Sequence, residues 1–435
     1  MELIGLSEKN IAEISNIKNE EQWVLDYRLK SYQTFKKLAM PEFGPDFELD
    51  FDKVIYYKND DNKLNSNWNN IDQNVKNEFA ALGVIDSEKY LDGIGVQYES
   101  EVIYHNMIEE LVQKNVIFTS IEMAMKKYPD LVQKYFSKIV SSADNKFTAL
   151  NGAVFSGGSF IYIPPNTTLD RPLQSYFRIN SKSMGQFERT LIIVDDNSHL
   201  HYVEGCTAPT YSDSSLHAAV VEIYVGKNSS CRYTTIQNWA PNVLNLVTKR
   251  ALVEENGVME WIDGNIGSLA TMKYPACILK GDNASGTCIT ISVATKNQQQ
   301  DSGARMIHIG KNTTSNIISK SISRLGGNAT YRGKVDIMKS ALGSKSIVKC
   351  DSLILDKESK SDAYPTNICR NSSSNIEHEA TVSRVNEDNL FYLMSKGLSE
   401  EKATELIVLG FIEKFREELP MEYAVELNQL LKRNL

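Results

Sequence analysis

The stretch SNIISKSISRLGGNATYRGKVDIMKSALGSKSIVKCDSLIL, residues 315–355, contains short runs of alternating side chains separated by small polar turns. The runs occupy 315–323, 329–337 and 346–355, and the turns between them contain GGN and ALGS. Alternation with a period of two is typical of β-strands, whereas an amphipathic helix repeats every three or four residues. This stretch therefore predicts consecutive short strands.

The same pattern continues on both sides, from about Phe147 to about Ser383. It includes HLHYVEG at 199–205, SCRYTTIQNW at 230–239 and GVMEWIDG at 257–264, and the turns that precede strands read DDNS, GKNSS, EEN and GKNTTS. Neighbouring entry points recur at intervals near 15 or 30 residues. The pattern predicts an all-β unit, either a β-solenoid or a large sandwich. We favour the solenoid, because repeated polar turns with varied strands suit stacked rungs.

Helical spacing flanks this unit. Residues 6–38 and 104–140 show apolar positions at helical intervals, and after Ser383 helices are predicted to begin at Asn386, Ser399 and Pro420. The sequence therefore predicts a helical domain at 1–146, a β core at 147–383 and a helical domain at 384–435.

The second C-terminal helix carries an apolar stripe with Ile407, Phe411 and Phe415 four residues apart. Such a stripe is more often core than interface, and any part of it that stays exposed would be a docking surface.

The composition limits the function classes. A net charge of −8 and a pI near 5.5 argue against a general nucleic-acid surface. No apolar run approaches the ~18 residues of a membrane span, and the N-terminus lacks a signal-peptide core. We expect a cytoplasmic protein that binds neither nucleic acid nor membrane. A protein of an organelle stroma or matrix, encoded there or processed, would look the same.

Several familiar sites are missing from the sequence. The six cysteines form no CxxC pair, which excludes a zinc ribbon and a small disulfide scaffold. GKNTTS after Ile309 lacks the first glycine of a Walker A loop, since Arg305 stands there, so any ATP chemistry belongs to another chain. There is no GxSxG elbow. The Asp-rich and Asn-rich interval 58–70 is predicted to be a solvated loop, not a calcium site.

Thiol, imidazole and carboxylate groups gather in IVKCDSLIL at 347–355 and NIEHEAT at 375–381. Alternation places Glu377 and Glu379 on one face and His378 on the other. Two carboxylates so close repel one another unless they are solvated, protonated or bridged by a cation. From the residues alone, a cation site that includes Cys350 and a solvated strand face both stay open.

A second thiol, Cys206, ends the run HLHYVEGC and shares a face with Glu204. A neighbouring carboxylate raises the pKa of a thiol, whereas a nearby Lys or Arg lowers it and favours the nucleophilic thiolate. Arg178 and Lys249 are candidates for that cation.

Motifs spread along the chain in a consistent order resemble the SufB/SufD family, in particular the SufB scaffold subunits of the SUF iron–sulfur cluster assembly machinery. The similar segments are GVQYESEVIYHN at 95–106, SYFRIN at 175–180, EGCTAP at 204–209, QNW at 237–239, VTKRA at 247–251, MIHIGKNT at 306–313, KCDS at 349–352, CRNSSSNIEHEAT at 369–381 and EDNLFYLMSKGLSEE at 387–401.

The resemblance implies a central right-handed parallel β-helix between two helical domains. It implies a non-catalytic scaffold that pairs through its β-helix with a SufD-like subunit or with a second copy of itself. A SufC-like ATPase would dock on the C-terminal helices, and a cysteine desulfurase with its sulfur carrier would deliver sulfur. The resemblance leaves open whether a reduced flavin takes part and which type of cluster is built.

The same resemblance assigns residues. Sulfur would enter as persulfide at Cys206 and pass through the β-helix along a polar route. A transient iron–sulfur cluster would form at Cys350 with the EHE group, Glu379 above all, and the metal-binding set would be Cys350, Glu377, His378 and Glu379. The residues that correspond to the polar route are Arg178, Asn180, Gln237, Trp239 and Lys249.

The sequence differs from the family pattern at two points, and two other functions stay open. No cysteine precedes Cys206, so the N-terminal cysteine cluster of some relatives has no counterpart, and the segment after Trp239 is shorter than in some relatives. Cys369 is expected to be structural. The alternatives are a β-helix polysaccharide lyase or hydrolase that uses Glu377 and Glu379, and a structural interaction protein with inert cysteines.

Overall fold

The computed structural model describes residues 2–58, 91–179, 184–207 and 215–419, together with Ala424 and Leu427. The predicted loop at 58–70 beyond Lys58, the route residue Asn180 and the start of the last predicted helix at Pro420 lie outside the described residues.

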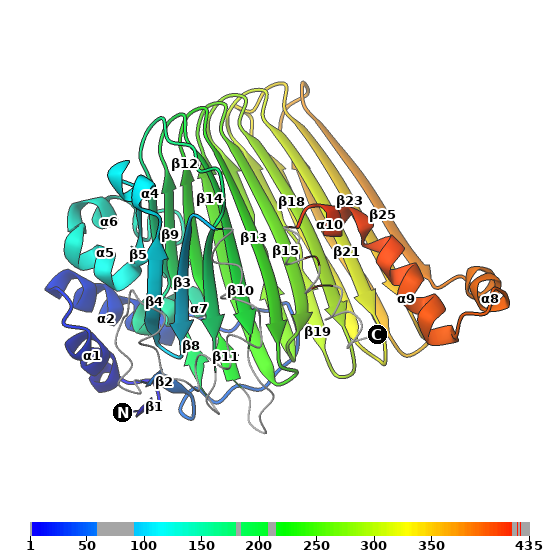
Figure 1. The fold of residues 1–435 in the computed structure, drawn as a ribbon, viewed down its shortest axis with the longest axis horizontal. Coiled ribbons are helices and arrows are strands. Elements are labelled where there is room, and N and C mark those ends of the chain that lie inside the picture. The colour runs from blue at the N-terminus through cyan, green and yellow to red at the C-terminus, as the bar shows by residue number, and fades with distance from the viewer. Residues whose placement is uncertain are drawn as a thin grey trace.

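Two mainly parallel sheets stack into a β-solenoid, which confirms the predicted fold class (Figure 1). In the described part of the chain, the first sheet has ten strands, which are β3 (Gly93–Tyr98), β4 (Glu101–Met107), β7 (Leu173–Arg178), β10 (His199–Thr207), β13 (Ser230–Trp239), β15 (Val258–Gly267), β18 (Ser285–Ala294), β21 (Thr314–Ser323), β23 (Lys345–Ile354) and β25 (Asn375–Arg384).

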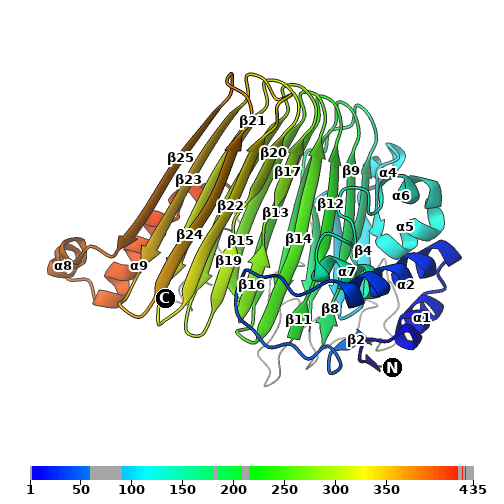
Figure 2. The same ribbon diagram turned by 180° about the vertical axis from the view of Figure 1, so that it is seen from behind.

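The second sheet lies behind the first (Figure 2). Its described strands are β5 (Ile117–Ser120), β6 (Ser159–Ile163), β8 (Gly185–Gln186), β9 (Arg189–Val194), β11 (Ser215–His217), β12 (Val220–Val225), β14 (Val243–Val253), β16 (Ala270–Lys273), β17 (Ala276–Leu279), β19 (Gln299–Ser302), β20 (Arg305–His308), β22 (Asn328–Ile337) and β24 (Lys360–Cys369). A separate antiparallel pair joins β1 (Glu2–Ile4) to β2 (Ile55–Lys58).

Asparagines in the turns explain the repeat. Asn197, Asn228, Asn256 and Asn283 all have positive φ, between 53° and 59°, a left-handed conformation that asparagine tolerates better than most residues. Each side-chain amide donates to the side-chain oxygen of the asparagine one rung earlier, at 2.9–3.1 Å, beginning at Asn166. The polar turns of the sequence therefore form a ladder that keeps consecutive rungs in step.

The N-terminal region mixes helices with strands. Helices α1 (Glu8–Ile17) and α2 (Gln22–Lys37) confirm the helical prediction for 6–38. The prediction for 104–140 is partly wrong, because its first residues belong to β4 and a later part is β5. Pairing of β4 with β3 and of β5 with β6 overrides the local helical spacing. The other helices here are α4 (Glu109–Gln113), α5 (Ile121–Lys127), α6 (Pro129–Tyr135) and α7 (Lys146–Val154).

Three helices follow the solenoid: α8 (Glu387–Ser395), α9 (Glu400–Phe411) and α10 (Glu413–Glu417). Asn386 and Ser399 cap α8 and α9 as predicted, since their side chains accept backbone N–H bonds at 2.8 and 3.2 Å. Helices α9 and α10 cover the outer face of the first sheet, where Val408, Ile412 and Phe415 pack in one buried cluster with sheet residues such as Ile262 and Ile291. The apolar stripe is therefore largely core.

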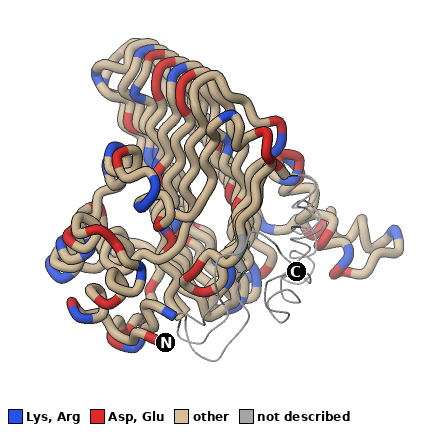
Figure 3. The backbone as a smooth tube through the Cα atoms, turned by 60° about the vertical axis from the view of Figure 1, so that its left-hand side comes forward, with Lys and Arg blue, Asp and Glu red and all other residues tan. Residues whose placement is uncertain are grey.

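Charged residues gather in the turns and helices, while the strands carry few (Figure 3). Within the described residues, no helix is long and apolar enough to cross a membrane. The proposed division at residues 146 and 383 stays a prediction, and strands of the first 146 residues belong to both sheets.

Candidate functional site

One row of inward-facing side chains runs along the first sheet from Glu204 to Cys350. The strands are parallel and in register, so residues that pair directly stack about 4.8 Å apart. Five such steps place Cys350 on the same row as Glu204, about 24 Å along the solenoid. The row consists of Glu204, Thr235, Asp263, Thr290, Ser319 and Cys350.

A second polar row lies two residues further along each strand and begins at Cys206. It consists of Cys206, Gln237, Asn265, Ser292, Ser321 and Ser352. Hydroxyls bridge the later rungs: Thr290 donates to Ser319 at 3.0 Å, and Ser321 and Ser352 are 2.7 Å apart. The two rows form a continuous polar column inside the solenoid, which we call the interior column.

The thiol at the start of the column is buried beside an acid. Cys206 is 1% exposed, and its Sγ lies 3.7 Å from Oε1 of Glu204. Burial raises the pKa of Cys206 well above its usual value, and the charge of Glu204 raises it further. Tyr233 donates a hydrogen bond to the same carboxylate. Burial and the neighbouring carboxylate therefore both favour the protonated thiol of Cys206 in this conformation.

Cations inside the solenoid oppose that effect. Lys249 Nζ donates to Thr235 at 2.7 Å and lies 3.3 Å from Asp263, while Lys273 Nζ lies 2.9 Å from the same carboxylate. All three charged side chains are at most 1% exposed. Burial lowers the pKa of Lys273 to about 8, whereas Asp263 and Glu204 hold the pKa of Lys249 above its usual value despite burial. Two ammonium groups thus share one carboxylate inside the column, and Glu204 on the neighbouring rungs also interacts with both of them.

Two buried donors near Cys206 have no hydrogen-bond partner among the described residues. They are Nε2 of Gln237 and Nε1 of Trp239. Gln237 pairs with Cys206 across the strands, and Trp239 packs in the same buried cluster as the thiol. Unpaired buried N–H groups are costly, and an anion bound beside them would satisfy them.

A hydrogen-bonded chain fixes the Gln237 side chain. Asn245 donates to Gln237 at 2.9 Å, His217 lies 2.8 Å from Asn245, and Glu188 lies 2.6 Å from His217. Arg178 pairs with Thr207, one position beyond Cys206, and is half-buried. Four of the five predicted route residues thus lie on the strands around Cys206, while Asn180 is outside the described residues.

At the other end of the column, Cys350 meets His378. The distance from Cys350 Sγ to His378 Nε2 is 3.6 Å, and Asn367 Nδ2 donates to His378 Nδ1 at 3.0 Å. Burial raises the pKa of Cys350 to about 11 and lowers that of His378. The buried hydroxyl of Tyr331, whose ring centroid is 6.5 Å from that of His378, has no partner among the described residues. A soft thiol and a neutral imidazole therefore face one interior space.

The carboxylates of Glu377 and Glu379 point away from Cys350, toward the surface. Glu377 and Glu379 are exposed; Glu377 accepts from Asn375 at 3.1 Å, and Glu379 lies 3.6 Å from Lys349. The predicted alternation is confirmed, and for the same reason the structure brings together Cys350 and His378 but not the full predicted metal set. Within the described part of the chain, no group of three or more His, Cys, Asp or Glu side chains could hold a metal ion.

Sequence reasoning missed Asp263, Lys273, Asn367 and Tyr331. Each of these residues lies on a strand whose neighbours in the sheet are about thirty residues away in the sequence. Only the register of the paired strands shows which residues lie side by side. Cys369 is exposed on β24, away from Cys350. Three other cysteines are buried in a hydrophobic cluster that also contains Cys350, namely Cys231, Cys277 and Cys288.

Comparison with known proteins gives the family. Residues 177–411 match the family described as SUF system FeS cluster assembly, SufBD core domain, and residues 11–175 match the SufBD protein N-terminal region.

Curated relatives agree. The chain is 56% identical over 430 residues to an iron–sulfur cluster assembly SufBD family protein of Staphylococcus aureus strain USA300, covering 98% of this chain and 92% of the relative. It is 57% identical over 430 residues to such a protein of Staphylococcus saprophyticus, with the same coverage. This decides against the lyase or hydrolase alternative. The chain belongs to the SufBD family of iron–sulfur cluster assembly proteins.

Proposed function

We propose that this chain is a SufB-type scaffold that accepts sulfur at Cys206 and builds a nascent iron–sulfur cluster at Cys350. The observation that carries the proposal is the interior column, which joins the two thiols along consecutive strands. Thiols at both ends favour the scaffold role over that of a SufD-like partner, because thiolates exchange sulfane sulfur and bind iron.

In the first step, the thiolate of Cys206 attacks the terminal sulfur of a carrier persulfide. The S–S bond of the carrier breaks, its thiolate leaves, and a persulfide forms on Cys206 without net oxidation or reduction. Glu204 lies close enough to the thiol to accept its proton, directly or through a water. Because Cys206 is buried, delivery needs a local opening of the structure.

The column suits an anionic sulfur species. Lys249 and Lys273 provide positive charge, and the unpaired N–H groups of Gln237 and Trp239 provide donors near Cys206. At the far end, Cys350 and His378 provide soft and intermediate ligands for iron, which is the substrate of this assembly reaction.

Further ligands and a second subunit would meet at the exposed end of the solenoid. Strands β24 and β25 are the last described strands of their sheets, and Tyr364 and Val382 on them are 51% and 55% exposed. Unpaired strand edges of this kind favour association with another chain. We propose that a SufD-like subunit or a second copy joins here, next to Cys350 and the carboxylates of Glu377 and Glu379.

In this proposal, the SufC-like ATPase docks on α8. Ile407 and Phe411 pack partly against the first sheet, whereas Phe391 and Tyr392 on α8 are 74% and 60% exposed. Helix α8 projects beyond the solenoid at its C-terminal end (Figure 1). An exposed aromatic pair on a projecting helix suits helix-in-groove recognition.

Anaerobic reconstitution with iron, cysteine desulfurase, its carrier and the ATPase tests the proposal. We expect mass spectrometry to find a persulfide on Cys206, and visible absorption to show a cluster that Cys350→Ala abolishes. Cys206→Ala should remove the persulfide and slow cluster formation, and Cys369→Ala should behave like the unmodified chain. Normal cluster formation in both Cys350→Ala and Cys206→Ala would sink the assignment.

A further inference from the structure

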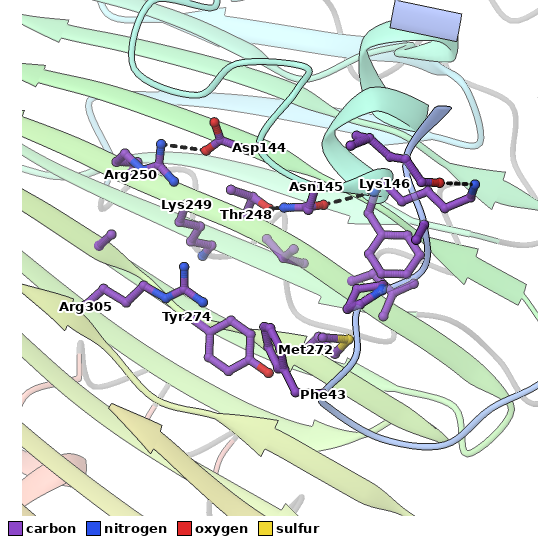
Figure 4. A pocket seen from close by; sticks show the side chains of 17 residues that line it. Phe43, Asp144, Asn145, Lys146, Thr248, Lys249, Arg250, Met272, Tyr274 and Arg305 are labelled. Atoms are coloured by element: carbon purple, nitrogen blue, oxygen red, sulfur yellow. Dashed lines mark hydrogen bonds and ion pairs between the residues drawn. The ribbon is translucent and has the colours of Figure 1, made fainter. Parts of the chain in front are cut away.

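A cavity of about 440 Å³ lies on the outer face of the second sheet, outside the interior column. Its walls are the segment that follows α2, the start of α7 and strands β14, β16 and β20 (Figure 4). Lys249 lines the cavity, but its ammonium group bonds Thr235 and Asp263 inside the solenoid. The cavity and the interior column are therefore on opposite faces of β14.

One side of the cavity is apolar and aromatic. Phe43, Phe147, Met272 and Tyr274 contribute side chains to it, and the rings of Phe43 and Tyr274 are 6.1 Å apart, centroid to centroid. The volume lies in the range of about 300–1,000 Å³ that is usual for small-molecule sites, which are mostly apolar with a few polar groups. A ligand with a flat apolar body would fit this wall.

Lysines and arginines outnumber carboxylates among the residues that line the cavity. Arg250 pairs with Asp144 at 2.6 Å, and Lys146 donates to the backbone carbonyl of Leu38 at 2.7 Å. Arg305 lies over the ring of Tyr274 at 5.3 Å, and no carboxylate of the described residues forms an ion pair with it. In Figure 4, Arg250 and Arg305 lie at the left of the view, and Phe43 and Met272 lie near its centre beside Tyr274.

We propose that this cavity binds a small planar anion, an aromatic carboxylate, whose carboxylate pairs with Arg305 and whose ring packs against the aromatic wall of Phe43 and Tyr274. A guanidinium group presents two parallel N–H donors that match a carboxylate. An uncharged aromatic molecule would give Arg305 no ion-pair partner, and inorganic phosphate would leave the apolar wall unfilled. The site is independent of the sulfur-transfer function.

Binding would tie the segment after α2 to the solenoid. Ala39, Pro41 and Phe43 of that segment form one wall, and Asp46 is held to β19 by reciprocal bonds with Gln299 at 3.0 and 3.2 Å. A ligand that contacts both walls should therefore slow hydrogen exchange at residues 38–46, because local opening would cost its contacts.

Calorimetric titration of the full chain with naphthalene-2-carboxylate, compared with the uncharged naphthalene-2-carboxamide, tests the proposal. We expect one site, with the carboxamide weaker by about tenfold or more because charge-assisted bonds are lost. Arg305→Gln should weaken carboxylate binding by a similar factor and leave carboxamide binding unchanged. Arg384→Gln on exposed β25 is the matched control and should bind both compounds like the unmodified chain.

Equal affinity for the two compounds, no binding of either, or unchanged carboxylate affinity in Arg305→Gln would overturn the proposal. Should Arg305→Gln fail to fold, Arg305→Lys and Tyr274→Leu replace it. The lysine variant should retain part of the preference for the carboxylate, and the leucine variant should weaken both compounds together. Hydrogen exchange that is slowed elsewhere but not at 38–46 would also contradict this site.

Discussion

Cys350 Sγ and His378 Nε2 lie 3.6 Å apart although 28 residues separate them, because β23 and β25 are neighbours in register. Asn367 on β24, in the opposite sheet, bonds the other ring nitrogen of His378. Two sheets thus converge on one thiol and imidazole pair at the end of the interior column.

This pair predicts metal binding that depends on both sheets. We expect His378→Ala to weaken Co²⁺ binding to the chain assembled with its partner subunit by about tenfold or more. Asn367→Leu should weaken it by a similar or smaller factor, because the imidazole of His378 loses the bond that orients it. Thiolate-to-cobalt absorption reports binding. His199→Ala, at the other end of the solenoid, is the control. Equal cobalt affinity in the His378 and His199 variants would exclude His378 as a ligand.

The buried lysines predict a pH-dependent stability. Burial lowers the pKa of Lys273 in the folded chain to about 8 from an ordinary 10.5, so the unfolded state binds more protons between these values. The free energy of unfolding should therefore rise with pH in that window, by up to about 3 kcal/mol from this group. Lys273→Met removes the contribution.

Urea unfolding between pH 7.5 and 10 checks this expectation. The unmodified chain should gain stability relative to Lys273→Met as the pH rises, and Lys280→Met, on the exposed surface, should show no such difference. If the difference in free energy of unfolding between the unmodified chain and Lys273→Met stays constant across this pH range, the pKa of Lys273 is not lowered in the folded state.

The asparagine ladder predicts a substitution pattern in the turns. Asn228 has a φ of 54° and bonds Asn197 and Asn256 through its side chain. Asn228→Ala should cost about 2 kcal/mol, because it loses both bonds and strains the backbone, whereas Asn228→Gly should cost about 1 kcal/mol less. Chemical unfolding measures both variants. Alanine as stable as glycine would show that the backbone conformation is not what selects asparagine.

The exposed aromatic side chains of α8 predict where the ATPase docks. Phe391→Glu should abolish capture of a SufC-like ATPase in a pull-down without lowering the unfolding midpoint, since the side chain is 74% exposed. Val112→Glu, on exposed α4, is the matched control and should retain the ATPase. Retention by Phe391→Glu would move the docking surface away from α8.

Local patterns in the sequence correctly predicted the strands, the turns and which side chains share a face. Glu204 and Cys206 face inward together, and Glu377 and Glu379 lie opposite His378, as alternation requires. These features depend only on the two-residue period of a strand and on turn chemistry. The helical prediction for 104–140 was partly wrong because long-range pairing overrode it.

The sequence by itself thus determined that the chain is a stack of short strands with thiols in two of them. Only the tertiary structure decided that Glu204 and Cys350 share a row, that Lys273 joins Lys249 at Asp263, and which part of the C-terminal stripe is covered. The physical reason is that alternation is a property of each strand, whereas register depends on the length of every coil and the fit of every turn between strands.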